Sequence, residues 1–290
     1  IFYRTERMTI NDCILEARHV SYSYGSGEEP SLKDLSLSIR RGRRTAVMGA
    51  NGSGKSTFFL CCNGILRPDE GQIYYDGQPL SYRKRDLLSL REKVGIVFQN
   101  PDTQLFCASV YQEISFGPLN LGLSREEAAK EVEAVIRRLG ITPFRHRPAH
   151  ALSGGQKKQV ALADILVMYP ELLILDEPFA ALDPGHIRII RDMIRDLERD
   201  RSPSGPLTVV IATHDADFAL EWADEVILFR EGQVLAQGDA VSILTDQKLL
   251  ELAGFELPAV IKVFESLQTE GLLNSEVPAP RNFDQLTDYI

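Results

Sequence analysis

One glycine-rich turn limits the possible folds of this chain more than any other feature. It reads GANGSGKS, from Gly49 to Ser56, and follows the apolar segment 44–48, which is typical of a short buried strand. Residues 54–64 favour a helix. Between a strand and a helix, the pattern G-x-x-x-x-G-K-[ST] lets successive backbone N–H groups turn inward around phosphate oxygens. The sequence therefore predicts a phosphate-binding loop.

Several residues of this loop have expected roles. Lys55 is expected to reach the β- and γ-phosphates of a nucleotide, and the Ser56 hydroxyl is expected to ligate Mg²⁺. The other predicted nucleotide contacts are Gly49, Asn51, Gly52, Ser53, Gly54 and Thr57.

Short strands alternate with helices along most of the chain. The expected strands are 13–24, 31–40, 44–48, 71–75 with a hairpin turn at 76–78, 94–98, 172–175 and 207–212. Helices are expected at 54–64, at 187–199, and between a capping Ser124, with Glu127 three residues on, and a terminating Gly140. This alternation predicts the α/β class, with a mainly parallel sheet that helices cover on both faces. Residues 100–159 then form a helical insertion in the sheet.

A second signal is LLILDEP, from Leu172 to Pro178. Four aliphatic residues predict a buried strand that ends in two adjacent carboxylates. Asp176 could hold Mg²⁺ through its water shell, and Glu177 is placed to activate an attacking water as a general base.

A third signal is LSGGQKKQVALA, from Leu152 to Ala163. Ser153, Gly154, Gly155 and Gln156 lie at a predicted helix start, where a hydroxyl and unhindered amides make a second anion site. Lys55 already serves one nucleotide's γ-phosphate. A dimer explains the second site, because each chain's Ser153 segment could close over the other chain's nucleotide.

With these motifs in order, the sequence resembles the ATP-binding cassette (ABC) ATPases over roughly residues 13–238. The resemblance implies a nucleotide-binding fold with an antiparallel β subdomain, a mainly parallel core sheet and a helical subdomain, and it implies hydrolysis of ATP with Mg²⁺. By position in the family's motifs, Tyr24 would stack on adenine, Gln99 would sense Mg²⁺ and the attacking water, and His214 would contact the γ-phosphate. Asp183, at the end of the AALD motif, would contact the opposite subunit. Two positions of the signature helix depart from the family's usual residues, namely Gln159 and Asp164.

The sequence FQNPDTQLF…FGPLNLGL, from Phe98 to Leu123, is similar to that of the ATPases of cobalt, nickel and vitamin importers of the energy-coupling factor (ECF) type. That resemblance implies a peripheral subunit at the cytoplasmic face of the membrane. Its partners would be a transmembrane coupling protein and a membrane substrate-binding component. Leu105 and Phe106 could offer an apolar foothold to such a partner, or both could turn back into the core of the insertion. The dimer could be homomeric or formed with a paralogous ATPase.

Two other functions remain as alternatives. One is a soluble ABC ATPase acting on nucleic acid or ribosomes, but the net charge of −9 gives no reason to expect nucleic acid, and neither a second phosphate loop nor a heptad tract occurs. The other is an unrelated phosphate-loop kinase, for which LSGGQ would have no purpose. No apolar stretch approaches the length of a membrane helix, so a soluble protein is expected. The four cysteines show no metal-site spacing and are expected as reduced thiols in or near the core.

The expected domains are an ATPase domain over 8–240, with its helical subdomain at about 101–159, and a C-terminal helical extension over 241–290. Helical patterns at 240–250 and 258–267 support the extension. Met8 could be the natural start, with residues 1–7 preceding it.

Overall fold

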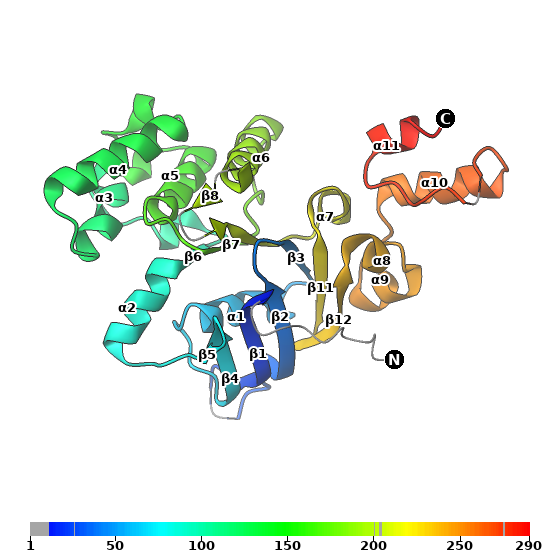
Figure 1. Cartoon of the computed structure of the whole chain (residues 1–290), viewed down its shortest axis with the longest axis horizontal. Coiled ribbons are helices and arrows are strands. Elements are labelled where there is room, and N and C mark those ends of the chain that lie inside the picture. The colour runs from blue at the N-terminus through cyan, green and yellow to red at the C-terminus, as the bar shows by residue number, and fades with distance from the viewer. Residues whose placement is uncertain (1–11, 26, 200, 203–204, 275) are drawn as a thin grey trace. The chain divides into compact units, whose positions relative to one another are not determined.

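The computed structural model describes residues 12–25, 27–199, 201–202, 205–274 and 276–290, so the proposed start at Met8 lies outside the described residues. Contacts divide the chain into two compact units. Of the described residues, unit 1 holds those up to Cys61 and those within Arg67–Leu80 and Val210–Ile290; unit 2 holds those within Cys62–Leu66 and Ser81–Val209. Figure 1 shows the elements of both units, coloured along the chain.

Unit 1 contains the expected antiparallel sheet, with strand order β2-β1-β4-β5. Its strands are β1 (Cys13–Tyr22), β2 (Leu32–Arg40), β4 (Glu70–Tyr75) and β5 (Gln78–Pro79). The predicted hairpin between β4 and β5 is confirmed. Asp76 and Gly77 in its turn both have positive φ, at 48° and 72°, as the tight turns that join antiparallel strands require.

The phosphate loop of unit 1 leaves a parallel strand pair. The predicted strand 44–48 is β3 (Arg44–Met48), and it pairs parallel with β11 (Glu225–Arg230), which pairs antiparallel with β12 (Gln233–Asp239). The helix after the loop is α1 (Lys55–Cys62), whose buried Phe58 packs against Phe229 of β11 with ring centroids 5.7 Å apart. This contact fixes the start of α1, and therefore the loop, over the sheet.

The rest of unit 1 is mostly helical. After β10 (Thr208–Ala212), which crosses the boundary between the units, come α7 (Ala216–Trp222), α8 (Ala240–Leu244), α9 (Gln247–Ala253), α10 (Ala259–Thr269) and α11 (Phe283–Thr287). The continuous helical pattern predicted over 240–250 is wrong, because the structure breaks it into α8 and α9. Asp246 accepts a hydrogen bond from the Leu249 amide and so caps a new helix instead of continuing the first.

Unit 2 combines a parallel strand pair with a group of helices. β6 (Val94–Val97) pairs parallel with β7 (Leu172–Asp176) in the register Val97 to Leu175. The remaining elements are α2 (Lys84–Lys93), α3 (Val110–Asn120), α4 (Arg125–Arg138), α5 (Gly154–Leu166), α6 (Pro184–Arg199), the short pair β8 (Arg201–Ser202) and β9 (Gly205–Pro206), and the 3₁₀ turns η2 (Pro101–Thr103), η3 (Thr142–Phe144) and η4 (Ala149–Ala151). Helices α3, α4 and α5 lie side by side (Figure 1). The predicted capping box of Ser124 and Glu127 is confirmed at the start of α4.

Both units confirm the expected α/β class. Among the described residues, no helix combines the length and the apolar character needed to cross a membrane. All four cysteines are free thiols; Cys61 and Cys62 are buried, and Cys13 and Cys107 are partly buried. Burial raises the pKa of Cys61 to about 12, which keeps it a protonated thiol at neutral pH.

Helix α5 packs closely against β6 because Gly95 has no side chain. A Cβ at Gly95 would lie 2.1 Å from Cγ2 of Ile165, on the last turns of α5. Ile165 is branched at Cβ, so its Cγ2 cannot swing away without a rotamer change. This close approach holds the last turn of α5 against β6, and the Ser153 segment lies at the opposite end of the same helix.

We predict that Gly95→Ala destabilises the protein by about 1–3 kcal/mol, the usual cost of overpacking a core. Urea unfolding measured by circular dichroism gives the value. The double variant Gly95→Ala/Ile165→Ala is the control, since removing Cγ2 makes room for the new methyl group. If the two changes simply add, the contact between α5 and β6 does not limit the packing.

Candidate functional site

The phosphate loop of unit 1 requires glycine at two positions. A Cβ at Gly49 would lie 2.5 Å from the carbonyl oxygen of Phe229, which no backbone adjustment of β11 could easily relieve. Gly54 has a φ of +102°, and a Cβ there would lie 2.6 Å from the carbonyl oxygen of Ser31. Gly52 also has positive φ, but the space around it is open. The loop is thus held tightly at both ends and is open at its tip.

Polar groups inside this loop are suited to phosphate oxygens. The Lys55 side chain is buried and donates from Nζ to the carbonyl oxygens of Gly49, at 2.6 Å, and Ala50, at 3.1 Å. Ser53 Oγ is buried and has no hydrogen-bond partner among the described residues. A buried hydroxyl without a partner next to a lysine is unusual unless a ligand completes it. These observations fit the predicted roles of Lys55 and Ser53 toward a nucleotide.

Other predicted nucleotide contacts also lie in unit 1. The Tyr24 ring is 58% exposed, and its hydroxyl lies 3.2 Å from Oγ1 of Thr57, on the helix that follows the loop. An exposed aromatic face tied to α1 fits the proposed stacking on adenine. His214 is exposed after β10, and its ring stacks on Phe255 with centroids 6.3 Å apart. Asn51 is exposed beside Gly52 on the loop, and Ser56 is exposed in the first turn of α1.

In unit 2 the structure brings two predicted catalytic residues into contact. Asp176 ends β7 and is only 7% exposed, and Glu177 follows it with a φ of 45°. Gln99, two residues after β6, donates from Nε2 to Oε2 of Glu177 at 2.7 Å. The pairing of Val97 with Leu175 explains this contact. Gln99 follows Val97 by two residues and Glu177 follows Leu175 by two, so the two side chains leave the strand pair at the same level. A carboxylate held at a strand end by an amide is suited to orient a water molecule.

The signature segment of unit 2 begins helix α5 as predicted. Ser153 caps the helix: its Oγ accepts from the Gln156 amide, and Gln156 Oε1 accepts from the Ser153 amide at 3.1 Å. Space around Gly154 is open, whereas a Cβ at Gly155 would meet the His186 ring at 2.0 Å. Asp183 caps the start of α6 within its own chain, because its Oδ1 accepts from the amides of Gly185 and His186, and its Oδ2 lies 2.5 Å from Nδ1 of His186.

Sequence reasoning missed Lys158, which lies on α5 beside these residues. It is 6% exposed, and its Nζ donates to the carbonyl oxygens of Glu177, Pro178 and Ala180 at 2.8–3.1 Å. Burial lowers the pKa of Lys158 to about 8, although the charges of Glu177 and Asp176 oppose that shift. A signal was present: Gly155, Lys158, Gln159 and Leu162 follow helical spacing and are all buried. A lysine on the buried face of an amphipathic helix calls for a polar partner inside the protein.

In the segment after Gln99, Leu105 and Phe106 have different environments, so neither of the two alternatives holds for both. Pro101 is buried at the first position of η2, and Asn100 caps that turn by accepting from the Asp102 amide. Leu105 is 9% exposed and belongs to the core, so the expectation that it forms a foothold is wrong. Phe106 is 67% exposed and meets Phe116 of α3 edge-on, with centroids 4.9 Å apart. The chain turns between the two residues, and only the second faces outward.

A buried carboxyl group and a half-buried one lie near this segment. Glu113 is almost fully buried, and its Oε2 accepts from the amides of Phe106, at 2.9 Å, and Cys107, at 2.6 Å. Burial and the neighbouring charge of Glu113 raise the pKa of Asp164 to about 7, while a hydrogen bond with Gln104 acts in the opposite direction. Asp164 is one of the departures from the family pattern, and here it shares its surroundings with a second acid.

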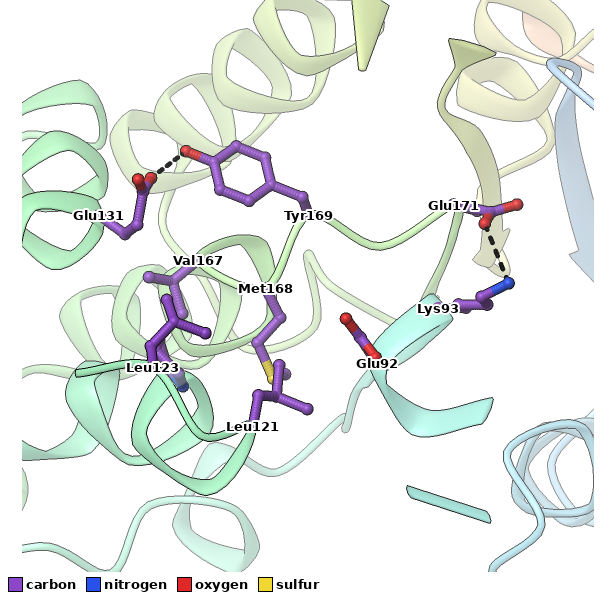
Figure 2. A pocket seen from close by; sticks show the side chains of 10 residues that line it. Glu92, Lys93, Leu121, Leu123, Glu131, Val167, Met168, Tyr169 and Glu171 are labelled. Carbon is purple, nitrogen blue, oxygen red and sulfur yellow. Dashed lines mark hydrogen bonds and ion pairs between the residues drawn. The ribbon is translucent and has the colours of Figure 1, made fainter. Parts of the chain in front are cut away.

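Two surface hollows lie on unit 2. One includes Phe106, Phe116, Leu88, Ile65 and Met168 among its lining residues. The other, shown in Figure 2, has apolar walls that include Leu121, Leu123, Val167 and Met168. Its rim is mainly acidic: Tyr169 donates to Glu131 at 2.5 Å, and Lys93 pairs with Glu171 at 3.6 Å, with Glu92 close by (Figure 2). Met168, Leu121 and Glu92 line both hollows.

Comparison with known proteins gives consistent matches. The family model described as ABC transporter matches residues 32–180, and a model described as AAA domain, putative AbiEii toxin, Type IV TA system, matches the overlapping residues 141–221. The chain is 40% identical over 259 residues to the energy-coupling factor transporter ATP-binding protein EcfA2 of Clostridium perfringens, covering 89% of each chain. It is also 40% identical to a putative ABC transporter ATP-binding protein of Methanosarcina mazei, of whose length it spans only 56%.

Solved structures agree with these sequence matches. The structure of cbiO1 from Clostridium perfringens, described as part of the ABC transporter complex cbiONQ, is 40% identical and has a TM-score of 0.72. It covers 88% of this chain and 99% of its own. The dimeric post-hydrolysis state of the ATP-binding cassette MJ0796, bound to ADP and Pi, is 27% identical with a TM-score of 0.69, covering 78% of this chain and 98% of its own.

For the pair Glu113 and Asp164, we predict that Asp164→Asn stabilises the protein above pH 7 by about 1–3 kcal/mol, the cost of an imperfectly paired polar group in a mainly apolar environment. The folded-state pKa of Asp164, about 7, lies above its ordinary value of 3.8. The folded state therefore binds a proton that the unfolded state releases, so stability is lost as pH rises toward 7 and the full penalty applies above it.

The measurement is urea unfolding of the wild type and the variant at pH 5 and pH 8. The advantage of Asp164→Asn should be larger at pH 8 than at pH 5. The exposed Asp192→Asn is the matched control and should change stability equally little at both values. An advantage of Asp164→Asn that is the same at both pH values would contradict the shift.

Proposed function

Because the chain belongs to the ABC transporter ATP-binding family, we propose that it is the ATP-hydrolysing subunit of an importer of the energy-coupling factor type. The contact that carries this proposal is the hydrogen bond from Gln99 to Glu177 at the end of β7. The relatives named as energy-coupling factor ATP-binding proteins support the importer class.

In this mechanism the chain's own residues position the γ-phosphate and the attacking water. Lys55 exchanges its two loop carbonyls for phosphate oxygens, and the open tip at Gly52 admits the phosphate chain. Glu177 takes the proton of the attacking water as its oxygen approaches the γ-phosphorus, while Gln99 orients that water and the carboxylate. Ser56 and Asp176 are the residues that would hold Mg²⁺, which supplies positive charge to the phosphate oxygens when bound. His214 contributes a further γ-phosphate contact.

The second anion site supports a dimer. Ser153 and the exposed Gly154 amide lie at the start of α5, a 13-residue helix whose N-terminus favours an anion. We propose that this segment contacts the nucleotide held by a second ATPase chain, either another copy or a paralogue, with Asp183 at the same interface. The dimeric state of the MJ0796 cassette is in line with this arrangement.

The proposed membrane partner is a transmembrane coupling subunit that docks on the face of unit 2 carrying Phe106 and Phe116, together with a substrate-binding component. Exposed Phe106 and Phe116 give this face an apolar centre, and the hollow of Figure 2 extends it toward an acidic rim. A helix with apolar residues and flanking basic residues fits such a face. The chain would then lie at the cytoplasmic side of the membrane.

Cobalt is the first candidate solute, since a similar structure belongs to a protein described as part of cbiONQ; nickel and vitamins follow. The alternative of a soluble ABC ATPase that acts on nucleic acid or ribosomes has less support, because the net charge is −9.

We predict that Glu177→Gln lowers ATP turnover about 10²–10⁴-fold, the usual cost of losing a general base. The amide keeps the shape of the side chain, so binding of a fluorescent ATP analogue should remain within a few-fold of the wild-type value. Phosphate release measured with excess ATP and Mg²⁺ reports turnover. Glu126→Gln, an exposed glutamate on α4, is the matched control. Wild-type turnover in Glu177→Gln would rule out the proposed base.

The docking surface gives a separate prediction. Phe106→Ser should spare basal ATPase activity and melting temperature, because the ring is exposed and lies away from the loop of Lys55 along the chain. It should weaken binding of the coexpressed coupling subunit about tenfold or more, since burying a large apolar side chain contributes about 1.5–3 kcal/mol.

Two controls accompany that test. Phe283→Ser changes another exposed aromatic residue, on α11, and should not affect the pull-down. Leu105→Ala should instead lower the melting temperature, because Leu105 is core. A pull-down of the coupling subunit that is unchanged by Phe106→Ser would remove this face from the interface.

A further inference from the structure

Lys158 makes an uncommon set of contacts for a buried lysine. All three carbonyl oxygens that it reaches, those of Glu177, Pro178 and Ala180, belong to the backbone just after β7. An ammonium group has three donors, so these contacts use its full capacity. All three donors of Lys158 therefore bond to backbone carbonyls and none bonds to a carboxylate. The ammonium group thus stabilises the backbone conformation of the segment after β7.

That main chain is strained. Glu177 and Ala181 both have left-handed backbone, with φ of 45° and 59°, although neither is glycine. Such conformations persist only where the surrounding structure holds them. The Glu177 carbonyl oxygen also accepts from the Ala180 amide at 3.1 Å, so Glu177 is the first residue of a hydrogen-bonded turn that ends at Ala180. The convergence of three carbonyl dipoles on one point would repel without a cation between them.

The side chain of Glu177 is held from a different direction. Gln99 bonds its carboxylate from the end of β6, whereas Lys158 bonds its carbonyl from helix α5. The backbone at this residue thus depends on α5, and the carboxylate depends on β6. If either Lys158 or Gln99 is removed, the remaining contact alone does not fix the direction of the Glu177 carboxylate.

We infer that Lys158 is a positioning residue for Glu177, which sets the backbone turn that aims its carboxylate. The inference rests on the proposed role of Glu177 as the general base. It adds a residue of the signature helix to the machinery of the site that Glu177 serves. Lys158 lies one helical turn after Gly155, so one rigid helix carries both the second anion site and the support of the base.

The test compares Lys158→Met with wild type in ATP turnover. Methionine keeps length and apolar bulk but donates no hydrogen bond. Turnover should fall about 10- to 100-fold, the scale on which misplacement of a catalytic group acts. The KM for ATP and the affinity for a fluorescent ATP analogue should stay within about twofold. Lys158→Arg, which keeps the charge and the donors, should restore most of the turnover. Lys130→Met, an exposed lysine on α4, is the matched control.

A double-mutant cycle separates this role from general support of the fold. If Lys158 acts through Glu177, then adding Lys158→Met to Glu177→Gln should lower the residual single-turnover rate by less than about threefold. Should Lys158→Met not fold, Lys158→Gln, which keeps a neutral donor, takes its place in the same cycle.

Three results would overturn the inference: wild-type turnover in Lys158→Met, no rescue by Lys158→Arg, or an equal fold loss in both backgrounds of the cycle. The proposed function is tested separately by Glu177→Gln alone. An inactive Glu177→Gln with a fully active Lys158→Met would remove only the role of Lys158. An active Glu177→Gln would remove the base and, with it, this inference.

Discussion

The hydrogen bond between Gln99 and Glu177 depends on a single structural constraint, the parallel register of β6 and β7. Val97 is paired with Leu175, so each strand must leave the sheet at the same level. Two residues later, an amide and a carboxylate from positions far apart in the sequence meet at 2.7 Å. A shift of register by one residue would turn the side chains to opposite faces and separate them. Close packing of α5 on Gly95 supports this register from one side of the strand pair.

The features predicted most accurately from the sequence are those that depend on local chemistry. The strand before the phosphate loop has the bounds that the sequence predicts, residues 44–48. The capping box at Ser124 is also as predicted, because it depends only on side-chain and backbone hydrogen bonds within one turn. Features set by tertiary contacts were harder to predict. Leu105 and Phe106 are adjacent and similar in hydrophobicity, yet one is core and the other exposed. Only the direction of the chain after η2, which depends on its packing, distinguishes them.

The predicted site residues show the same division. The phosphate loop and the two carboxylates at the end of β7 lie where their motifs predict, because these motifs encode backbone geometry as well as chemistry. The role of Lys158 was not predicted, because lysine usually lies at the surface. Only its helical spacing from other buried residues indicates that it lies on the buried face of α5. Asp164 was noticed as a departure, but its closeness to Glu113 could not be read from the sequence, because the two lie on different helices.

The central claim is that each ATP is hydrolysed between the phosphate loop of one chain and the signature helix of another. An experimental structure of the Glu177→Gln protein with ATP and Mg²⁺ tests it most directly. The account predicts a dimer in which each γ-phosphate contacts Lys55 of one chain and the Ser153 hydroxyl of the other. A structure in which one chain alone makes every contact to the nucleotide, with Ser153 away from the γ-phosphate, would contradict it.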